Sequence, residues 1–149
     1  MAIFKFRVIN KDQDDFFRDI VIDSDKTFLD FHNIIAESIG FTLKASACFN
    51  LCDVKWHKLK KFLLPEEVVV KQDQSELMHE SKLTDFIKNP HQKLIYLIDS
   101  RNDFTFYIKL LEIVSFGSKN SETRCVASNG VLNKLDQISL SETIVIKKG

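Results

Sequence analysis

The segment TFLDFHNIIAESIG, residues 27–40, constrains the fold more than any other part of the sequence. Thr27 is followed three residues later by Asp30, the spacing of a capping box, in which the two side chains satisfy the first free N–H groups of a helix. Gly40 then supplies a residue that ends helices without steric cost. Apolar side chains recur at intervals that place them on one helix face, namely Phe28, Phe31, Ile35 and Ile39. We therefore expect an amphipathic helix over residues 27–38.

Runs with strand character lie on both sides of this helix. Residues 3–9 alternate between apolar side chains and Lys5 or Arg7, and residues 104–110 alternate in the same way. Further strands are predicted where apolar or β-branched residues cluster, at 20–22, 48–51, 94–98, 125–127 and 143–146.

Together these elements predict one α+β domain over residues 1–149, since a chain of 149 residues has the length of one ordinary domain. Its core is a mixed, mostly antiparallel sheet, with the helix at 27–38 packed on one face. A short second helix is expected over residues 82–88, with Leu83, Phe86 and Ile87 facing inward and Asn89-Pro90 ending it. Two strands followed by a crossing helix also begin a ubiquitin-like β-grasp, which we take as the topology of the first half.

The composition is that of a folded protein with no net charge. Hydrophobic residues make up 44% and charged residues 28%, and 21 basic side chains balance 21 acidic ones, so no overall field favours nucleic acid or anionic lipid. Thirteen phenylalanines fill volume without hydrogen bonding, so we expect most of them in a dry core, with the remainder contributing to an exposed apolar patch. Lys5 and Arg7 interrupt any signal-peptide core, and the three cysteines are an odd count, so we expect a cytoplasmic protein with reduced thiols.

The order of elements resembles the plasmid pRiA4b ORF-3-like family. That family has a segment Thr-hydrophobe-x-Asp-Leu-His-x-x-Ile before Gly-Trp, and residues 27–35 read TFLDFHNII before Gly40-Phe41. A second family segment resembles Tyr-x-Tyr-Asp-Phe-Gly-Asp-x-Trp-x-His-x-Ile-x-Leu, of which this chain keeps Tyr96, Asp99, Ile108 and Leu110. The resemblance covers about residues 4–130, and residues 131–149 form a divergent C-terminal segment.

The resemblance implies a divergent member that has lost most of the family's polar groups. His32, Tyr96 and Asp99 match family positions of unknown role, whereas a Trp, a His and a Gly of the second segment are replaced. The family has no established activity, and some of its members lie in mobile elements.

The polar run Asp99-Ser100-Arg101-Asn102-Asp103 separates two predicted strands. Asp99 and Asp103 have the chemistry of a carboxylate pair or a divalent-metal site. Asp and Asn are also the residues that turns prefer, and Arg101 would neutralise the acids. We interpret the run as a turn.

Cys48, Cys52 and His57, with Cys125 or His79 as a fourth ligand, suggest a zinc site. If Cys48 and Cys52 lie on one strand, however, four steps of about 3.3 Å place their sulfurs about 13 Å apart, too far for one ion. We assign no metal and interpret the cysteines as small buried hydrophobic residues.

The segment KWHKLKKF, residues 55–62, mixes phosphate-neutralising and stacking side chains as nucleic-acid binders do. The residues that would carry such binding are Lys55, Trp56, Lys58, Lys60 and Lys61. The alternative is a solvated strand or helix face with Trp56 and Leu59 turned inward.

His32, on the predicted helix, is either a ligand or proton carrier, or a boundary histidine bonded to backbone, which we favour. No catalytic residue and no cofactor is assigned. Three functions remain: a non-catalytic interaction module, which we favour, a nucleic-acid accessory protein of a mobile element, and a small metal-dependent enzyme. The partner expected is another protein or a second copy of the chain, with weak binding of nucleic acid as the alternative and no membrane.

Overall fold

The computed structural model describes residues 2–41, 46–65, 75–98, 104–115 and 123–131 of the chain. In chain order the described elements are β1 (Ala2–Asn10), β2 (Phe17–Asp23), α1 (Phe28–Ile39), β3 (Ala47–Cys52), β4 (Lys58–Leu63), β5 (Ser75–Leu77), the 3-10 turn η2 (Met78–Glu80), α2 (Leu83–Phe86), β6 (Lys93–Ile98), β7 (Phe104–Ser115) and β8 (Arg124–Asn129). The strands that the sequence predicts within these residues are present. The predicted strand at 143–146 lies outside the described residues.

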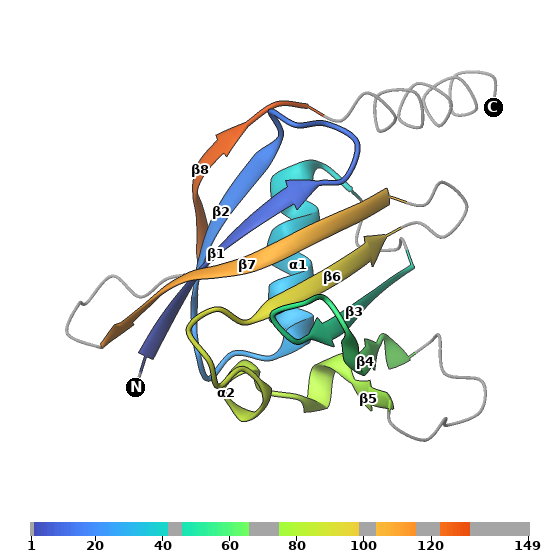
Figure 1. Ribbon diagram of the computed structural model, residues 1–149, viewed down its shortest axis with the longest axis vertical. Helices are drawn as coiled ribbons and strands as arrows, with labels where there is room; N and C mark the ends of the chain where they lie inside the picture. Colours follow the sequence, from blue (N-terminus) through green and yellow to red (C-terminus); the bar gives the residue numbers. More distant parts are fainter. Residues whose placement is uncertain (1, 42–45, 66–74, 99–103, 116–122, 132–149) are drawn as a thin grey trace, which may run out of the picture.

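The strands form one eight-stranded sheet in the order β5-β4-β3-β6-β7-β1-β2-β8. β4 and β5 are parallel, whereas the other neighbouring strands are antiparallel. The predicted α+β class with a mixed, mostly antiparallel sheet is confirmed. The first half begins with the hairpin and crossing helix that suggested a β-grasp, and β6 and β7 then lie between β1 and β3, so β7 runs through the middle of the sheet (Figure 1).

The main helix, α1, has the ends that the sequence predicts. The Asp30 backbone N–H donates to the Thr27 hydroxyl at 3.1 Å, and the Thr27 backbone N–H donates to the Asp30 carboxylate at 3.0 Å, which completes a capping box. Gly40 follows with φ 102°, in the left-handed region that glycine adopts without a Cβ clash, and its N–H donates to the Ala36 carbonyl. Local sequence therefore fixes both the start and the end of α1.

The C-terminal end of α1 is bonded to the sheet through a buried arginine. Arg18 donates to the carbonyls of Ser38, Phe17, Asn129 and Gly130 at 2.8 to 2.9 Å. Its guanidinium also lies 4.3 Å from the ring centre of Phe16. Loss of hydration lowers the pKa of this arginine, and no carboxylate accepts a hydrogen bond from it among the described residues. One cation therefore satisfies main-chain groups of α1, β2 and β8 together.

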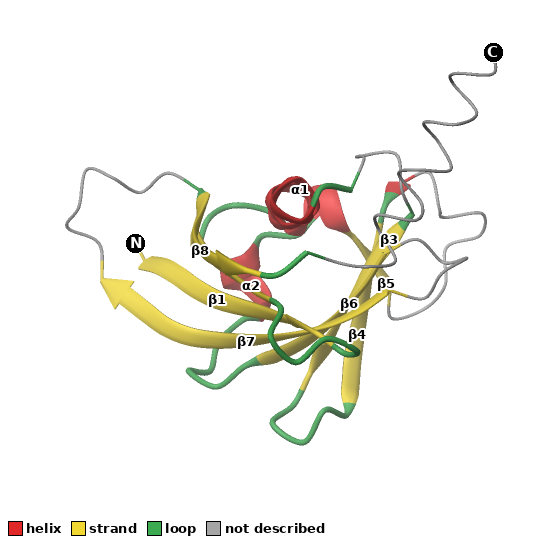
Figure 2. Ribbon diagram, turned by 90° about the horizontal axis from the view of Figure 1, so that it is seen from above, coloured by secondary structure: helices red, strands yellow, loops and turns green. Residues whose placement is uncertain are grey.

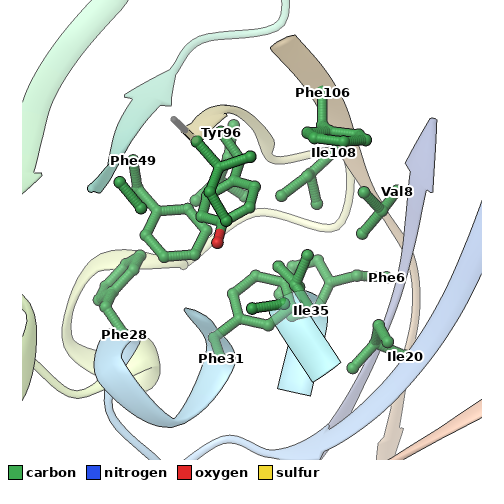
Figure 3. Close-up of a cluster of buried hydrophobic side chains, with 14 of the residues drawn as sticks. Phe6, Val8, Ile20, Phe28, Phe31, Ile35, Phe49, Tyr96, Phe106 and Ile108 are labelled. Carbon is green, nitrogen blue, oxygen red and sulfur yellow. The ribbon is translucent and has the colours of Figure 1, made fainter. Parts of the chain in front are cut away.

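Phenylalanine rings fill the space between α1 and the sheet (Figure 3). Phe31 of α1 stacks on Phe49 of β3 with 5.4 Å between ring centres, and Phe28 stacks on Phe62 of β4 at 3.9 Å. The exposed large hydrophobic residues are Val54, Leu59, Leu111, Ile113, Val114, Val126 and Val131. No phenylalanine of the described residues is among them, so the prediction that the core takes most of the rings is confirmed for this part of the chain. The exposed apolar side chains are aliphatic.

The second helix is shorter than predicted. It covers four residues, Leu83–Phe86, because Ile87 already has the extended backbone angles φ −97° and ψ 105° and buries its side chain. The segment is held to the start of α1, since the Leu83 N–H donates to the Lys26 carbonyl and the Phe28 N–H to the Ser81 carbonyl. In the described residues, no helix has the length and apolar character needed to cross a membrane.

Candidate functional site

The two faces of the sheet differ in what covers them. The inner face packs on α1, and the ring of Phe86 in α2 contacts Phe28 and Phe62 on the same side. Figure 2 shows both described helices on this side of the sheet. The opposite side, which we call the outer face, has no helix against it in the described part of the chain. Its accessible side chains are the functional candidates, whereas Asn50 and Cys52 of β3 on the same face are buried.

Strand register aligns basic residues on the outer face. Lys93 of β6 lies opposite Lys109 of β7, and Lys109 in turn lies opposite Arg7 of β1. Lys93 also lies opposite Cys52 of β3, which pairs with Lys58 of β4. One transverse row thus carries four cations from four strands.

An aromatic pair lies beside this row. Tyr107 is two residues from Lys109 on β7, and its ring contacts the ring of Trp56 edge to face, with 5.0 Å between centres and 67° between planes. The Lys93 ammonium lies 4.8 Å from the centre of the Trp56 ring and donates to the Val54 carbonyl. The outer patch is the name used below for the following residues: Arg7, Trp56, Lys58, Lys61, Lys93, Tyr107 and Lys109.

Few carboxylates neutralise the outer patch. Arg7 makes a two-point ion pair with Asp19, with N–O distances of 2.7 and 2.9 Å, and the Asp19 carboxylate is buried beneath it. This contact, through which the carboxylate accepts two hydrogen bonds, raises the pKa of Arg7. Lys58, Lys61 and Lys109 are exposed and form no salt bridge with any residue that the structure describes. Three uncompensated ammonium groups therefore face solvent on this side.

Trp56 is held over the sheet by a tight turn with an unusual backbone. The Trp56 N–H donates to the Asp53 carbonyl at 3.0 Å, and the Asp53 N–H donates to the His57 carbonyl at 3.0 Å. This pattern closes a three-residue hairpin loop whose last residue has a left-handed backbone, and Trp56 accordingly has φ 70°. Gly or Asn normally occupies such a position, because a bulky side chain there is strained. Trp56 thus places a large ring at a position where turn preferences alone favour Gly or Asn.

The Asp53 carboxylate organises the same turn. It accepts hydrogen bonds from the backbone N–H groups of His57 and Lys55, both at 2.9 Å, and lies 2.9 Å from the His57 ring nitrogen Nδ1. The bond from the His57 backbone N–H is the largest cause that lowers the pKa of Asp53 below its ordinary value. The turn that presents Trp56 is thus stabilised by an ionised side chain.

The structure divides the basic segment predicted from sequence. Trp56, Lys58 and Lys61 belong to the outer patch. Lys60 points the other way, pairs with Glu76 at 3.2 Å and lies 6.0 Å from the Phe86 ring centre. Lys55 is exposed in the turn. The alternative with Leu59 turned inward is wrong, because the bulge between β3 and β4 leaves Leu59 55% exposed.

Four members of the outer patch were missed by sequence analysis, namely Arg7, Lys93, Tyr107 and Lys109. They come from β1, β6 and β7, far from residues 55–62 in the chain, and only the strand register brings them together. The usable signal was alternation, because Tyr107 and Lys109 occupy the polar positions of a strand whose other side is apolar.

Of the three family-matching residues of unknown role, the two that the structure describes, His32 and Tyr96, are neighbours in the core. His32 Nδ1 lies 2.6 Å from the Tyr96 hydroxyl, and both residues are buried, at 1% and 0% exposure. In Figure 3 the Tyr96 hydroxyl points toward α1. His32 is therefore an interior residue bonded to a side chain, and the predicted boundary position is wrong because α1 turns this residue toward the sheet. Asp99, the third matching residue, lies outside the described residues with the whole run 99–103.

The cysteines do not converge. Cys48 and Cys52 both lie on β3, whereas Cys125 lies on β8, five strands away in the sheet. No group of three or more His, Cys, Asp or Glu side chains suited to a metal ion occurs in the described ranges. Cys52 is buried, and burial raises the pKa of its thiol, as expected of a small hydrophobic residue. Cys48 and Cys125 are half-buried.

Comparisons with known proteins identify a family and a fold. The family model described as plasmid pRiA4b ORF-3-like protein matches residues 2–134. A crystal structure of a protein of unknown function, MM3350 from Methanosarcina mazei Go1, is similar, with a TM-score of 0.70 and 18% identity over 85% of this chain and 68% of that one. At this identity the likeness concerns the fold. Comparison with curated protein sequences found no match.

Proposed function

The chain belongs to the plasmid pRiA4b ORF-3-like family, and we propose that it is a non-catalytic binding module whose outer face binds an anionic partner. The observation that carries this proposal is the row of cations on an open sheet face. Lys93, Lys109 and Arg7 stand on three adjacent strands with one carboxylate, Asp19, among their cross-strand neighbours in the row.

Such a row is unfavourable for the protein alone. Side chains directly opposite each other on neighbouring strands have Cβ atoms about 4.5–5.5 Å apart, and like charges there destabilise the sheet. The pairing of Lys109 with both Lys93 and Arg7 gives two like-charge contacts. An anionic ligand reverses the sign of this interaction, since it neutralises the charges that repel.

The proposed binding of an anionic partner is compatible with the zero net charge of the whole chain, which by itself does not indicate such binding. The whole chain is balanced at 21 basic and 21 acidic residues. The imbalance is local, because Lys58, Lys61 and Lys109 are unpaired in the described structure while Lys60 is neutralised by Glu76 on the other side. Binding through this face is governed by its own charges.

The test is retention on a heparin column with a charge-matched control. Replacing Lys93 and Lys109 together with Gln should lower the salt concentration at which the protein elutes. The control replaces Lys26 and Lys88 with Gln. These two lysines are exposed and lie in the segments beside α1 and α2, and their replacement removes the same amount of charge. Equal shifts in the two double variants, or passage of the unsubstituted protein through the column without retention, would overturn the proposal.

A further inference from the structure

We infer that the outer patch binds single-stranded nucleic acid, with bases stacking on Trp56 and Tyr107 and phosphates contacting the row of cations. The inference rests on the proposed function and names its partner. A generic polyanion requires only charges, whereas the outer patch joins them to two aromatic rings on an exposed sheet. That combination, a basic surface with stacking rings, is how proteins bind unpaired strands without sequence preference.

The rings are placed for stacking. Trp56 and Tyr107 are both half-buried, and their edge-to-face contact has 5.0 Å between ring centres and 67° between ring planes. Lys93 lies 4.8 Å from the Trp56 ring centre. A base that stacks on the indole would therefore bring its phosphate near a cation.

Backbone strain at Trp56 favours a ligand over a turn-forming role. Its φ of 70° lies in a region that costs an L-residue about 1–3 kcal/mol relative to glycine-like freedom. The hydrogen bonds of the turn are made by main-chain groups and by the Asp53 carboxylate, none of which needs an indole. Strained backbone of this kind clusters at binding sites, where the surrounding structure holds it.

The shape of the face selects a single strand over a duplex. Reading a duplex groove requires a helix or β-ribbon that enters it, and α1 lies on the inner face, away from the outer patch. Aromatic rings on a sheet reach only bases that are already unstacked. The cations extend from β4 to β1, four strand spacings of about 4.8 Å, so the row is about 19 Å long and spans roughly four to six nucleotides.

Trp56 is the one tryptophan of the chain and therefore reports on its own site. A labelled oligothymidylate of about ten nucleotides, long enough for a site of this size, is titrated with the full-length protein. Label anisotropy and quenching of Trp56 emission are recorded together. Heparin and a blunt duplex of matched length serve as the competing anions. We expect the single strand to bind with quenching, and log Kd to change with log salt at a slope of about 3 in magnitude, from four cations at about 0.7 each.

The deciding variant is Trp56→Gly, followed by anisotropy. Glycine fits a φ of 70°, so the turn should survive, and circular dichroism with a thermal melt checks that it does. Loss of stacking should weaken single-strand binding about tenfold or more while heparin binding stays within about twofold. Val54→Ala, which trims an exposed side chain of the same turn, is the matched control and should change neither.

The outcomes separate the two claims. Equal binding of heparin and oligothymidylate, with no Trp56 quenching and no effect of Trp56→Gly, would overturn the inference and leave an anion-binding face. Tighter binding of the duplex than of the single strand would also overturn it. If no anion binds at low salt, both the inference and the proposed function fall.

Discussion

The inner and outer faces of the sheet are built from alternate residues of the same strands, yet they follow opposite rules. On β7, Phe106 and Ile108 are fully buried under α1, whereas Tyr107 and Lys109 between them remain accessible. The inner face is apolar and closely packed, and the outer face places like charges side by side. The first face accounts for folding, and the second places together the charges that the proposed anionic partner would neutralise.

The largest expected effect is on the inner face. Phe31→Ala removes a ring that stacks on Phe49 and lies 4.6 Å from the ring centre of Phe6. Because Phe31 is fully buried, we expect the free energy of unfolding to fall by about 3–5 kcal/mol in urea denaturation. Leu59→Ala, at a position 55% exposed, is the control and should stay within about 0.5 kcal/mol. Similar losses at both positions would contradict the division between faces.

Arg18 is the charged member of the inner side and should rank second. Arg18→Met keeps the volume of the side chain but leaves the carbonyls of Ser38, Asn129 and Gly130 without their donor. We expect a loss of about 2–4 kcal/mol, since buried acceptors without partners are costly. In hydrogen exchange, the backbone amides at the end of α1 and along β8 should lose protection before those of β3 do. Arg18→Lys should recover only part, because one ammonium cannot reach carbonyls of three elements.

On the outer face the sign should reverse. Lys109→Gln removes a charge that lies opposite both Lys93 and Arg7, so we expect stability to rise by a few tenths of a kcal/mol at low salt. Lys5→Gln is the matched control on the same face, since Lys5 lies opposite Glu112 and its removal should slightly lower stability. Both effects should shrink in 1 M salt, where the Debye length is about 3 Å. A loss of stability in Lys109→Gln would contradict the claim that like charges on the outer face repel one another.

The smallest expected effect concerns the turn that presents Trp56. The pKa of Asp53 is lowered from its ordinary value of 3.8, so the ionised carboxylate stabilises the turn above that pH, and the stabilisation is lost as the pH falls through the folded pKa. We expect Trp56 emission to change below about pH 3.8 before far-UV circular dichroism does. Asp53→Asn should abolish this step, because an amide does not ionise in this range. If the change in Trp56 emission at acid pH persists in Asp53→Asn, a group other than Asp53 causes it.

Sequence alone predicts the inner face better than the outer one because its signals are local. Thr27, Asp30 and Gly40 specify the ends of α1 within fourteen residues of sequence. The apolar stripe of α1 indicates which side of the helix is buried. The β1 strand over residues 4–8 and the β7 strand over residues 104–110 show their inner sides by alternation. These features follow from the chain and its nearest neighbours.

The outer patch depends on information that is not local. Lys58, Lys93 and Lys109 come together only when β4, β3, β6 and β7 pair in one register, and a shift of one residue would turn them to the other face. Trp56 was identified as a candidate, but its left-handed backbone was not, because a bulky residue at that place contradicts turn preferences. Sequence analysis therefore predicted only the part of the outer patch that comes from residues 55–62.

The central place of β7 has a consequence for synthesis on the ribosome. β1 and β6 are not neighbours in the sheet, and each pairs with β7, whose residues 104–115 are made late. A nascent chain that stops before Phe104 holds two incomplete groups of strands with facing open edges. Such late, long-range pairing slows folding and leaves unpaired edges exposed to other chains in the meantime. Newly made protein should therefore need chaperone protection until that one strand emerges.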